Sequence, residues 1–265
     1  MPFFGKPAPP NEFRFVMVGK TGAGKSRVGN TILNTNAFTF ALDAKSVTSV
    51  CRLMSSENRF GKKIDLVDTP GVFDTEKDNE TVQIEICRCI SMTTPGPHAI
   101  LFCVQMGRFT DQEMDVLEHY IKYFGHNILN YLVFVFTHLD SWRESYKDRG
   151  VLVPSEDVYI KSLPEKAKSY LEKCNNRYIC LDNRAKEEEK EKTVKKLIEK
   201  VEEMLSKNGN SCYTDTNYEE AEKILQTMMT VNSLRDEIKN SESFLNKVNL
   251  YFKLVFQKIY LKLKT

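Results

Sequence analysis

Eight residues near the start of the chain combine glycines, lysines and a serine at a fixed spacing. They read Gly19-Lys20-Thr21-Gly22-Ala23-Gly24-Lys25-Ser26 and fit the pattern G-x-x-x-x-G-K-[ST] at every fixed position. Glycines let backbone N–H groups curl towards phosphate oxygens, and the helix that follows adds partial positive charge at its N-terminus. We therefore predict nucleotide contacts from Lys20, Thr21, Gly22, Ala23, Gly24, Lys25, Ser26 and Arg27, with Lys25 reaching the terminal phosphates and the Ser26 hydroxyl binding Mg²⁺.

Two later segments supply further groups for phosphate and metal. Asp68-Thr69-Pro70-Gly71 ends an apolar run, where a carboxylate beside the phosphate loop can hold Mg²⁺ through water. Gly71 can offer its N–H to the γ-phosphate. Between the two motifs lies a polar segment in which a second Mg²⁺-binding hydroxyl is expected, and Thr48 is the first candidate, with Ser46 as the alternate.

Two polar sites farther along the chain indicate which base is bound. Asp140, in Thr137-His138-Leu139-Asp140, can accept hydrogen bonds from both the N1–H and the amine of guanine. Opposite adenine the same carboxylate would be desolvated and unpaired, at a cost of about 1–3 kcal/mol or more. His138 can cover one face of the ring, and the amide of Asn183 can donate to guanine O6. The predicted ligands are therefore GTP or GDP with Mg²⁺.

The residue after Gly71 bears on whether the nucleotide is hydrolysed. A Ras-like GTPase has a glutamine there that orients water, whereas this chain has Val72. Intrinsic hydrolysis should be slow, with Lys25, Thr48 and Arg108 as the catalytic candidates. Arg108 would stabilise charge within a dimer, or else it is an ordinary exposed loop arginine. The sequence thus leaves two hypotheses open: a slow GTPase stimulated by self-assembly, or a nucleotide-controlled scaffold with negligible turnover.

Apolar runs and helical patterns alternate between residues 13 and 207, which predicts an α/β domain with a mostly parallel six-stranded sheet and helices on both faces. The expected strands are Phe13–Val18, Val47–Ser55, Lys63–Val67, Ala99–Gln105, Tyr131–Phe136 and Tyr178–Leu181. The second and third form a hairpin through Ser56–Lys62. The expected helices are Lys25–Leu33, Thr81–Ser91, Gln112–Phe124, Ser162–Lys173 and Lys186–Leu205.

Composition narrows the class of protein and its surroundings. The net charge of +2 argues against nucleic acid as the main partner, and seven cysteines without a C-x-x-C pair suit reduced, buried thiols. No signal peptide or lipidation signal is apparent, and no run of eighteen apolar residues occurs that would suit a transmembrane helix. We expect a cytoplasmic protein, with peripheral contact to intracellular membranes as an option.

The chain outside the central domain divides into three expected parts. Residues 1–12 read as a flexible N-terminus, 208–217 as a polar linker, and 218–265 as a C-terminal helical extension. On a helical wheel Phe244–Thr265 shows one broad apolar stripe and a second one formed by Leu250, Leu254 and Leu261. The broad stripe suits packing on the chain's own domain. The second stripe needs a partner, either another subunit or an anionic membrane surface.

Taken together, these motifs resemble the GTPases of immunity-associated proteins, the GIMAP or avrRpt2-induced-gene family of septin- and Toc-like G domains. The more specific marks are Gly96–Leu101 with Gly107–Thr110 and Phe124-Gly125, which resemble the family's box between its third and fourth motifs, and Arg177–Ala185, which resembles its fifth. Two positions depart from the pattern: His-Leu-Asp in the fourth motif, where many members have a basic pair before Glu, and Phe40, where many have Ser.

This resemblance implies a Ras-like G domain with a helical extension, GTP/GDP binding, homodimers or oligomers through the nucleotide face, and frequent membrane association. It supports seven residues as ligand contacts: Lys25, Ser26, Thr48, Asp68, Gly71, His138 and Asn183.

Overall fold

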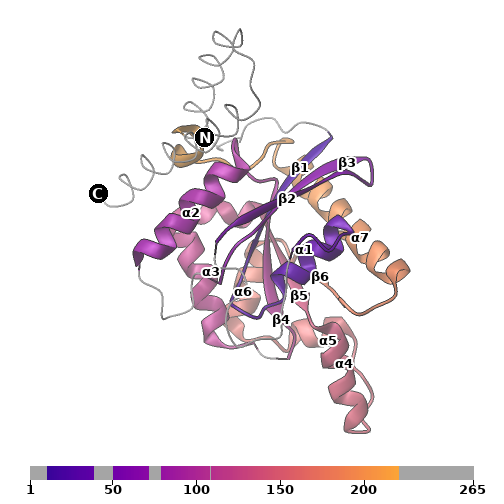
Figure 1. Cartoon of the computed structure of the whole chain (residues 1–265). Helices are drawn as coiled ribbons and strands as arrows, with labels where there is room; N and C mark the ends of the chain where they lie inside the picture. The colour runs from indigo at the N-terminus through magenta and orange to yellow at the C-terminus, as the bar shows by residue number, and fades with distance from the viewer. Residues whose placement is uncertain (1–10, 39–49, 72–78, 108, 221–265) are drawn as a thin grey trace.

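A six-stranded sheet forms the centre of the molecule (Figure 1). The computed structural model describes residues 11–38, 50–71, 79–107 and 109–220. The strands are β1 (Glu12–Val18), β2 (Arg52–Arg59), β3 (Lys62–Asp68), β4 (Ala99–Gln105), β5 (Leu132–Thr137) and β6 (Tyr178–Cys180), in the spatial order β2-β3-β1-β4-β5-β6. All neighbouring pairs are parallel except β2 and β3, which are antiparallel. The predicted mostly parallel, six-stranded sheet is confirmed.

Helices cover both faces of this sheet. They are α1 (Lys25–Leu33), α2 (Asn79–Thr93), α3 (Asp111–Phe124), α4 (Leu139–Asp148), α5 (Glu156–Lys161), α6 (Glu165–Lys173) and α7 (Glu187–Lys207), with a 3₁₀ turn, η1, at His126–Tyr131. In Figure 1, α1 and α7 lie together on one face, and α2 and α3 lie on the other. The central strands β4 and β5 are buried along almost their whole length, because both of their faces are covered. None of the helices within the described ranges is long and apolar enough to cross a membrane.

The hairpin at the sheet edge is displaced from its predicted position. β2 continues to Arg59, and the turn is made by Phe60 and Gly61, both with positive φ, at 54° and 76°. The predicted strand end at Ser55 was wrong because the second half of β2, Ser-Glu-Asn-Arg, is polar. As an edge strand, β2 alternates between partly covered and exposed residues, so a polar sequence does not end it.

The segment predicted as a linker, 208–217, packs on the domain instead of leading away from it. Tyr213 and Tyr218 are among the most buried large side chains of the described residues. The backbone N–H of Tyr213 donates to Pro97 O at 2.9 Å, and the Tyr218 hydroxyl lies 2.8 Å from Thr93 Oγ1. Both rings contact Phe124 at the end of α3. The two tyrosines therefore complete the core between α2 and α3. Of the proposed extension, only residues 218–220 are described.

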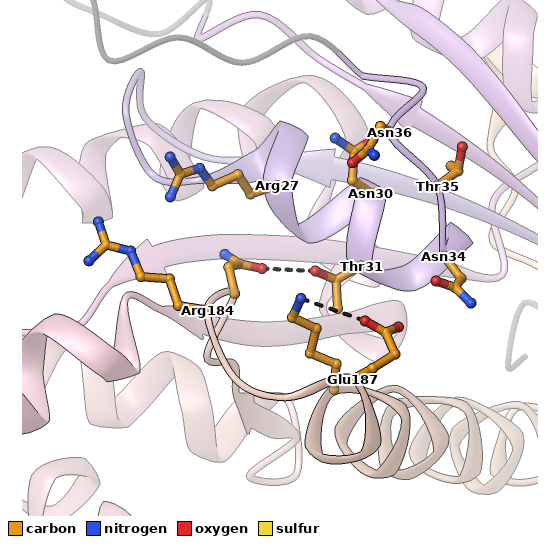
Figure 2. Close-up of a pocket in the computed structure, with 10 residues that line it drawn as sticks. Arg27, Asn30, Thr31, Asn34, Thr35, Asn36, Arg184 and Glu187 are labelled. Atoms are coloured by element: carbon orange, nitrogen blue, oxygen red, sulfur yellow. Dashed lines mark hydrogen bonds and ion pairs between the residues drawn. The ribbon is translucent and has the colours of Figure 1, made fainter.

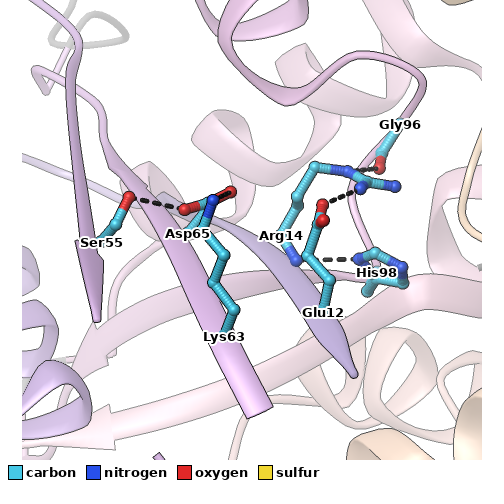
Figure 3. A network of polar contacts seen from close by, with 7 residues as sticks. All are labelled: Glu12, Arg14, Ser55, Lys63, Asp65, Gly96 and His98. Carbon is cyan, nitrogen blue, oxygen red and sulfur yellow. Dashed lines mark hydrogen bonds and ion pairs between the residues drawn. The ribbon is translucent and has the colours of Figure 1, made fainter. Parts of the chain in front are cut away.

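His98 directly precedes β4, at the same end of the sheet where β1 begins, and its role there is structural (Figure 3). The side chain is fully buried, and its Nδ1 accepts the backbone N–H of Arg14 at 2.8 Å. The Arg14 side chain donates to Gly96 O at 2.8 Å and pairs with Glu12. Burial, and secondarily the charge of Arg14, lowers the pKa of His98 to about 3. His98 is therefore a neutral member of the core at physiological pH.

Stability should fall with acid because of this histidine. In the unfolded chain His98 takes up a proton near pH 6.5, whereas in the fold it stays neutral to about pH 3, so stability is lost progressively between these values. Between pH 7.5 and pH 5 the protonation of His98 should lower the free energy of unfolding by about 2 kcal/mol. His98→Asn, whose amide oxygen can still accept from Arg14, should flatten that part of the profile in urea unfolding. The exposed His126→Asn serves as the control and should keep the wild-type slope. A full acid slope in His98→Asn would contradict this account.

All seven cysteine side chains are buried thiols, as predicted. Burial is the largest cause that raises the pKa of Cys87, Cys89, Cys103 and Cys174 to about 12. These thiols are protonated at neutral pH and act as small apolar core groups rather than as nucleophiles.

Candidate functional site

The predicted site residues gather at the carboxyl edge of the sheet. Because β1, β3, β4 and β5 run parallel, the segments that follow them meet along one edge. The loop after β1 leads into Lys25 at the start of α1, the end of β3 carries Asp68, and the end of β5 leads into His138 and Asp140. Motifs that are far apart in the sequence thus form one continuous surface.

The loop between β1 and α1 has the backbone that its glycines allow. Gly22 and Gly24 have φ of 80° and 83°, in the left-handed region that other residues rarely adopt. A Cβ at Gly24 would lie 3.2 Å from the His138 ring, so this glycine also lets the fourth motif approach the loop. The loop is braced from β5, because the Thr137 hydroxyl donates to Ala23 O at 2.8 Å.

Lys25 points back across the loop from the first turn of α1. Only 7% of the residue is exposed, and its Nζ donates to Gly19 O at 2.9 Å and to Lys20 O at 3.0 Å. These two carbonyls hold the ammonium group over the loop, where phosphates would lie against the backbone N–H groups. Lys20 behaves differently, since its side chain leaves the loop and donates to Gln112 on α3.

A second cluster joins the loop to the end of β3. The Ser26 hydroxyl donates to Asp68 Oδ2 at 2.6 Å, so the two predicted metal ligands lie side by side. Gly71 lies directly against Thr21: a Cβ at position 71 would fall 2.0 Å from Thr21 Oγ1 and 2.6 Å from the Thr21 nitrogen. Only glycine fits this approach without displacing the loop.

The base-recognition candidates begin at the end of β5. His138 has a φ of 57° and stands at the N-terminus of α4, with its Nδ1 2.9 Å from the Thr137 hydroxyl. Burial lowers the pKa of His138. The negative charge of Asp140 raises this pKa, and the positive charges of Arg27 and Arg184 lower it. The His138 ring is therefore neutral at pH 7. Asp140, in the first turn of α4, forms an ion pair with Arg184 at 3.2 Å, and the side chains are 17% and 62% exposed respectively.

Asn183 precedes Arg184 in the chain and lines a pocket of about 540 Å³, most of whose lining residues are labelled in Figure 2. Its Oδ1 accepts from the Thr31 hydroxyl at 3.1 Å, which leaves the amide N–H₂ as its remaining donor. The pocket is rich in cations and amides; the lining residues are Arg27, Asn30, Thr31, Asn34, Thr35, Asn36, Asn183, Arg184, Glu187 and Lys190. Such a lining suits an anionic or hydrogen-bonding ligand.

Several contributors were not predicted as site residues. Thr137 braces the loop, Thr31 orients Asn183, and Arg184 pairs with Asp140. Thr137 belongs to the Thr-His-Leu-Asp motif, so its position was available from the sequence. Arg184 belongs to the Arg177–Ala185 segment, but its pairing with Asp140 is visible only in the structure. Thr31 carries no motif, and only the meeting of α1 with the segment after β6 identifies it. Four predicted positions, Ser46, Thr48, Val72 and Arg108, lie outside the described residues, as do Leu250, Leu254 and Leu261 of the tail.

The architecture matches solved G domains. Toc33 from Arabidopsis thaliana in complex with GDP and Mg²⁺ superposes with a TM-score of 0.57 at 16% identity, covering 77% of this chain and 88% of that one. A second structure, from work on chloroplast translocon components atToc33 and psToc159, gives 0.54 at 15% identity, covering 73% and 83%. At this level of identity the likeness establishes the fold.

Sequence comparison goes further than the fold. Immune-associated nucleotide-binding protein 9 of Arabidopsis thaliana is 34% identical over 209 residues, which cover 78% of this chain and 59% of that protein. Immune-associated nucleotide-binding protein 7 is 32% identical over 247 residues, covering 89% and 78%. GTPase IMAP family member 8 of Homo sapiens is 30% identical over 200 residues, covering 76% and 28%. The chain thus spans little more than half the length of the first of these relatives.

The region of similarity contains every motif described above. A model of the AIG1 family matches residues 13–232, from the first strand through the phosphate loop, the Asp68 and Asp140 segments and the docked tyrosines. This match, together with the relatives and the G-domain fold, shows that the chain belongs to the AIG1 family.

Proposed function

We propose that this protein is a switch that binds GTP and GDP with Mg²⁺ and hydrolyses GTP slowly, with turnover stimulated by self-assembly. The observation that carries the proposal is the meeting of a complete phosphate loop with the Ser26–Asp68 pair at one sheet edge. The names of the relatives support the same class, since they include nucleotide-binding proteins and a GTPase.

The residues at this edge fit the phosphates and the metal. Lys25 and the loop N–H groups would bind the β- and γ-phosphates, and the strict need for glycine at position 71 keeps the backbone close to them. Ser26 and Asp68 offer a hydroxyl and a carboxylate oxygen, which are the hard ligands that Mg²⁺ prefers. When bound, Mg²⁺ would neutralise charge on the β- and γ-phosphates.

Base recognition would use Asp140, Asn183 and His138. Asp140 forms an ion pair with Arg184 in this structure, and guanine would offer two donors in place of that exposed side chain. Asn183, oriented by Thr31, would donate to O6. The neutral, half-buried His138 ring would lie against the base. The adjacent 540 Å³ pocket has the volume and polar lining to hold the ribose side of the nucleotide.

Assembly enters the proposal because position 72 does not supply the glutamine of a Ras-like GTPase. Val72 has no group that orients water, so a dilute monomer should turn over at or below the intrinsic Ras rate of about 10⁻⁴ s⁻¹. For atToc33 and psToc159, dimerization is described as important for GTPase activity. We extend this to the present chain, with Arg108 of one copy stabilising charge at the site of another.

Activity should therefore depend on concentration. Specific GTPase activity of the wild type should rise several-fold as the protein concentration approaches that of self-association, and Arg108→Ala should flatten this rise. Arg149→Ala, an exposed arginine at the end of α4, is the matched control and should behave like the wild type. Fast turnover that does not vary with concentration would refute the assembly mechanism.

Nucleotide binding itself is tested separately. The nucleotide that co-purifies with the protein should be GDP or GTP on ion-pair chromatography, with the oligomeric state measured by light scattering on the same sample. Binding of ATP as tightly as GTP would refute the guanine assignment.

A nucleotide-controlled scaffold is the second candidate, and Val72 is the observation that favours it. It predicts the same binding and the same assembly, but no rise in turnover with concentration. A cytoplasmic location, and contact of the C-terminal segment with a membrane or a second subunit, remain predictions from the sequence.

A further inference from the structure

Thr21, the third residue of the phosphate loop, has a hydroxyl that is buried and finds no hydrogen-bond partner within the described residues. Other hydroxyls at this edge of the sheet are engaged: Ser26 with Asp68, Thr69 with Met17 O, and Thr137 with Ala23 O. Buried hydroxyls are normally satisfied, because one without a partner has lost its water and gained nothing in return. The exception in the middle of a binding loop therefore points to a ligand.

The surroundings of Thr21 indicate which part of a ligand it would meet. On one side Lys25 Nζ is bound 3.0 Å from the carbonyl of Lys20, the residue just before Thr21. On the other side the backbone of Gly71 faces the hydroxyl so closely that a Cβ there would lie 2.0 Å from Oγ1. The hydroxyl thus packs against Gly71, one residue after a carbonyl that holds Lys25. In the proposed function both of these residues contact the terminal phosphate.

We propose that the Thr21 hydroxyl is a catalytic group for GTP hydrolysis, donating to a γ-phosphate oxygen and accepting a hydrogen bond from the attacking water. This assignment rests on the proposed function. A bond forms from the water oxygen to the γ-phosphorus as the bond from that phosphorus to the β-phosphate oxygen breaks, and the water's proton ends on the released phosphate. Thr21 keeps its own proton and supplies the water-orienting group that Val72 does not offer.

Two substitutions distinguish the effect of the Thr21 hydroxyl from that of the size and shape of the side chain. Thr21→Val replaces the hydroxyl with a methyl group of similar size, whereas Thr21→Ser keeps it. For each variant, titration calorimetry gives the affinities for GDP and for the non-hydrolysable analogue GMPPNP, and single-turnover assays give the hydrolysis rate. Thr193→Val, which removes an exposed hydroxyl on α7, is the matched control.

Thr21→Val should lose about tenfold in the affinity for GMPPNP relative to GDP, since GDP lacks the contacted group. Its hydrolysis rate should fall by about tenfold or more. Thr21→Ser should restore both, and Thr193→Val should change neither. If the wild type binds both nucleotides and Thr21→Val leaves their affinity ratio unchanged, or Thr21→Ser fails to restore it, the assignment of Thr21 is overturned alone. If the wild type binds neither nucleotide, the proposed function is overturned, and this inference with it.

Discussion

Lys25→Ala should abolish measurable binding of GDP and GTP while the domain remains folded. The substitution removes the only described side-chain cation held over the loop by two carbonyls, those of Gly19 and Lys20. Charge-assisted hydrogen bonds to phosphate contribute about 1.5–3 kcal/mol each, so two lost bonds weaken binding by about a hundredfold or more. Titration calorimetry with GDP is the direct measurement.

Burial of Lys25 makes a folding control necessary. Since only 7% of the residue is exposed, alanine also removes bracing from the loop, and the far-ultraviolet circular dichroism and thermal midpoint should be recorded on the same samples. Lys20→Ala removes the same charge from the same loop, but its side chain binds Gln112. This variant should lose at most a few-fold in affinity. Equal losses in both variants, or unchanged binding in Lys25→Ala, would show that the position of Lys25 is not what matters.

Asp140→Asn should change the preferred base from guanine to xanthine. The carboxylate can accept from both guanine donors, whereas an amide offers one acceptor and one donor. Xanthine has a carbonyl where guanine has its amine, so the amide can pair with both of its groups. Because a mismatched buried pair is strongly unfavourable, the ratio of GDP to xanthosine diphosphate affinity should fall by on the order of a hundredfold or more.

The ion pair between Arg184 and Asp140 makes a charge control necessary in this experiment. Arg184 pairs with Asp140 at 3.2 Å and would lose its charged partner in the variant, so a general change in charge must be excluded. Asp148→Asn makes the same charge change at the exposed end of the same helix, α4, and should retain guanine preference. An Asp140→Asn protein that still prefers GDP would remove Asp140 from the base site.

The sequence predicted most of the strands correctly, and it predicted a phosphate site, because both carry strong local signals. β4 and β5 are continuous apolar runs, buried on both faces, and the loop from Gly19 to Ser26 has a nearly unique spacing. The pairs Ser26–Asp68 and Thr21–Gly71 follow once the parallel order of β1 and β3 is known. Binding by these residues is still to be tested.

Elements with weak local signals were missed. α4 was not predicted, because it is short and mostly polar and only Leu139 and Trp142 of its residues are buried. α5 is a helix of six residues, too short for periodicity to show. The contact between Thr31 and Asn183 joins residues 152 positions apart, and no pattern along the chain reports it.

The buried side chains of Tyr213 and Tyr218 also determine where a stably folded fragment of this protein can end. A protein truncated after α7 at Lys207 would match the apparent end of the strand–helix alternation, yet it would expose Phe124 and the groove that Tyr213 and Tyr218 fill. Such a fragment should aggregate on expression, whereas one that continues past Tyr218 keeps its surface closed. For the same reason, cleavage by a protease after Lys207 should not release the following segment, because Tyr213 and Tyr218 would stay packed in the core.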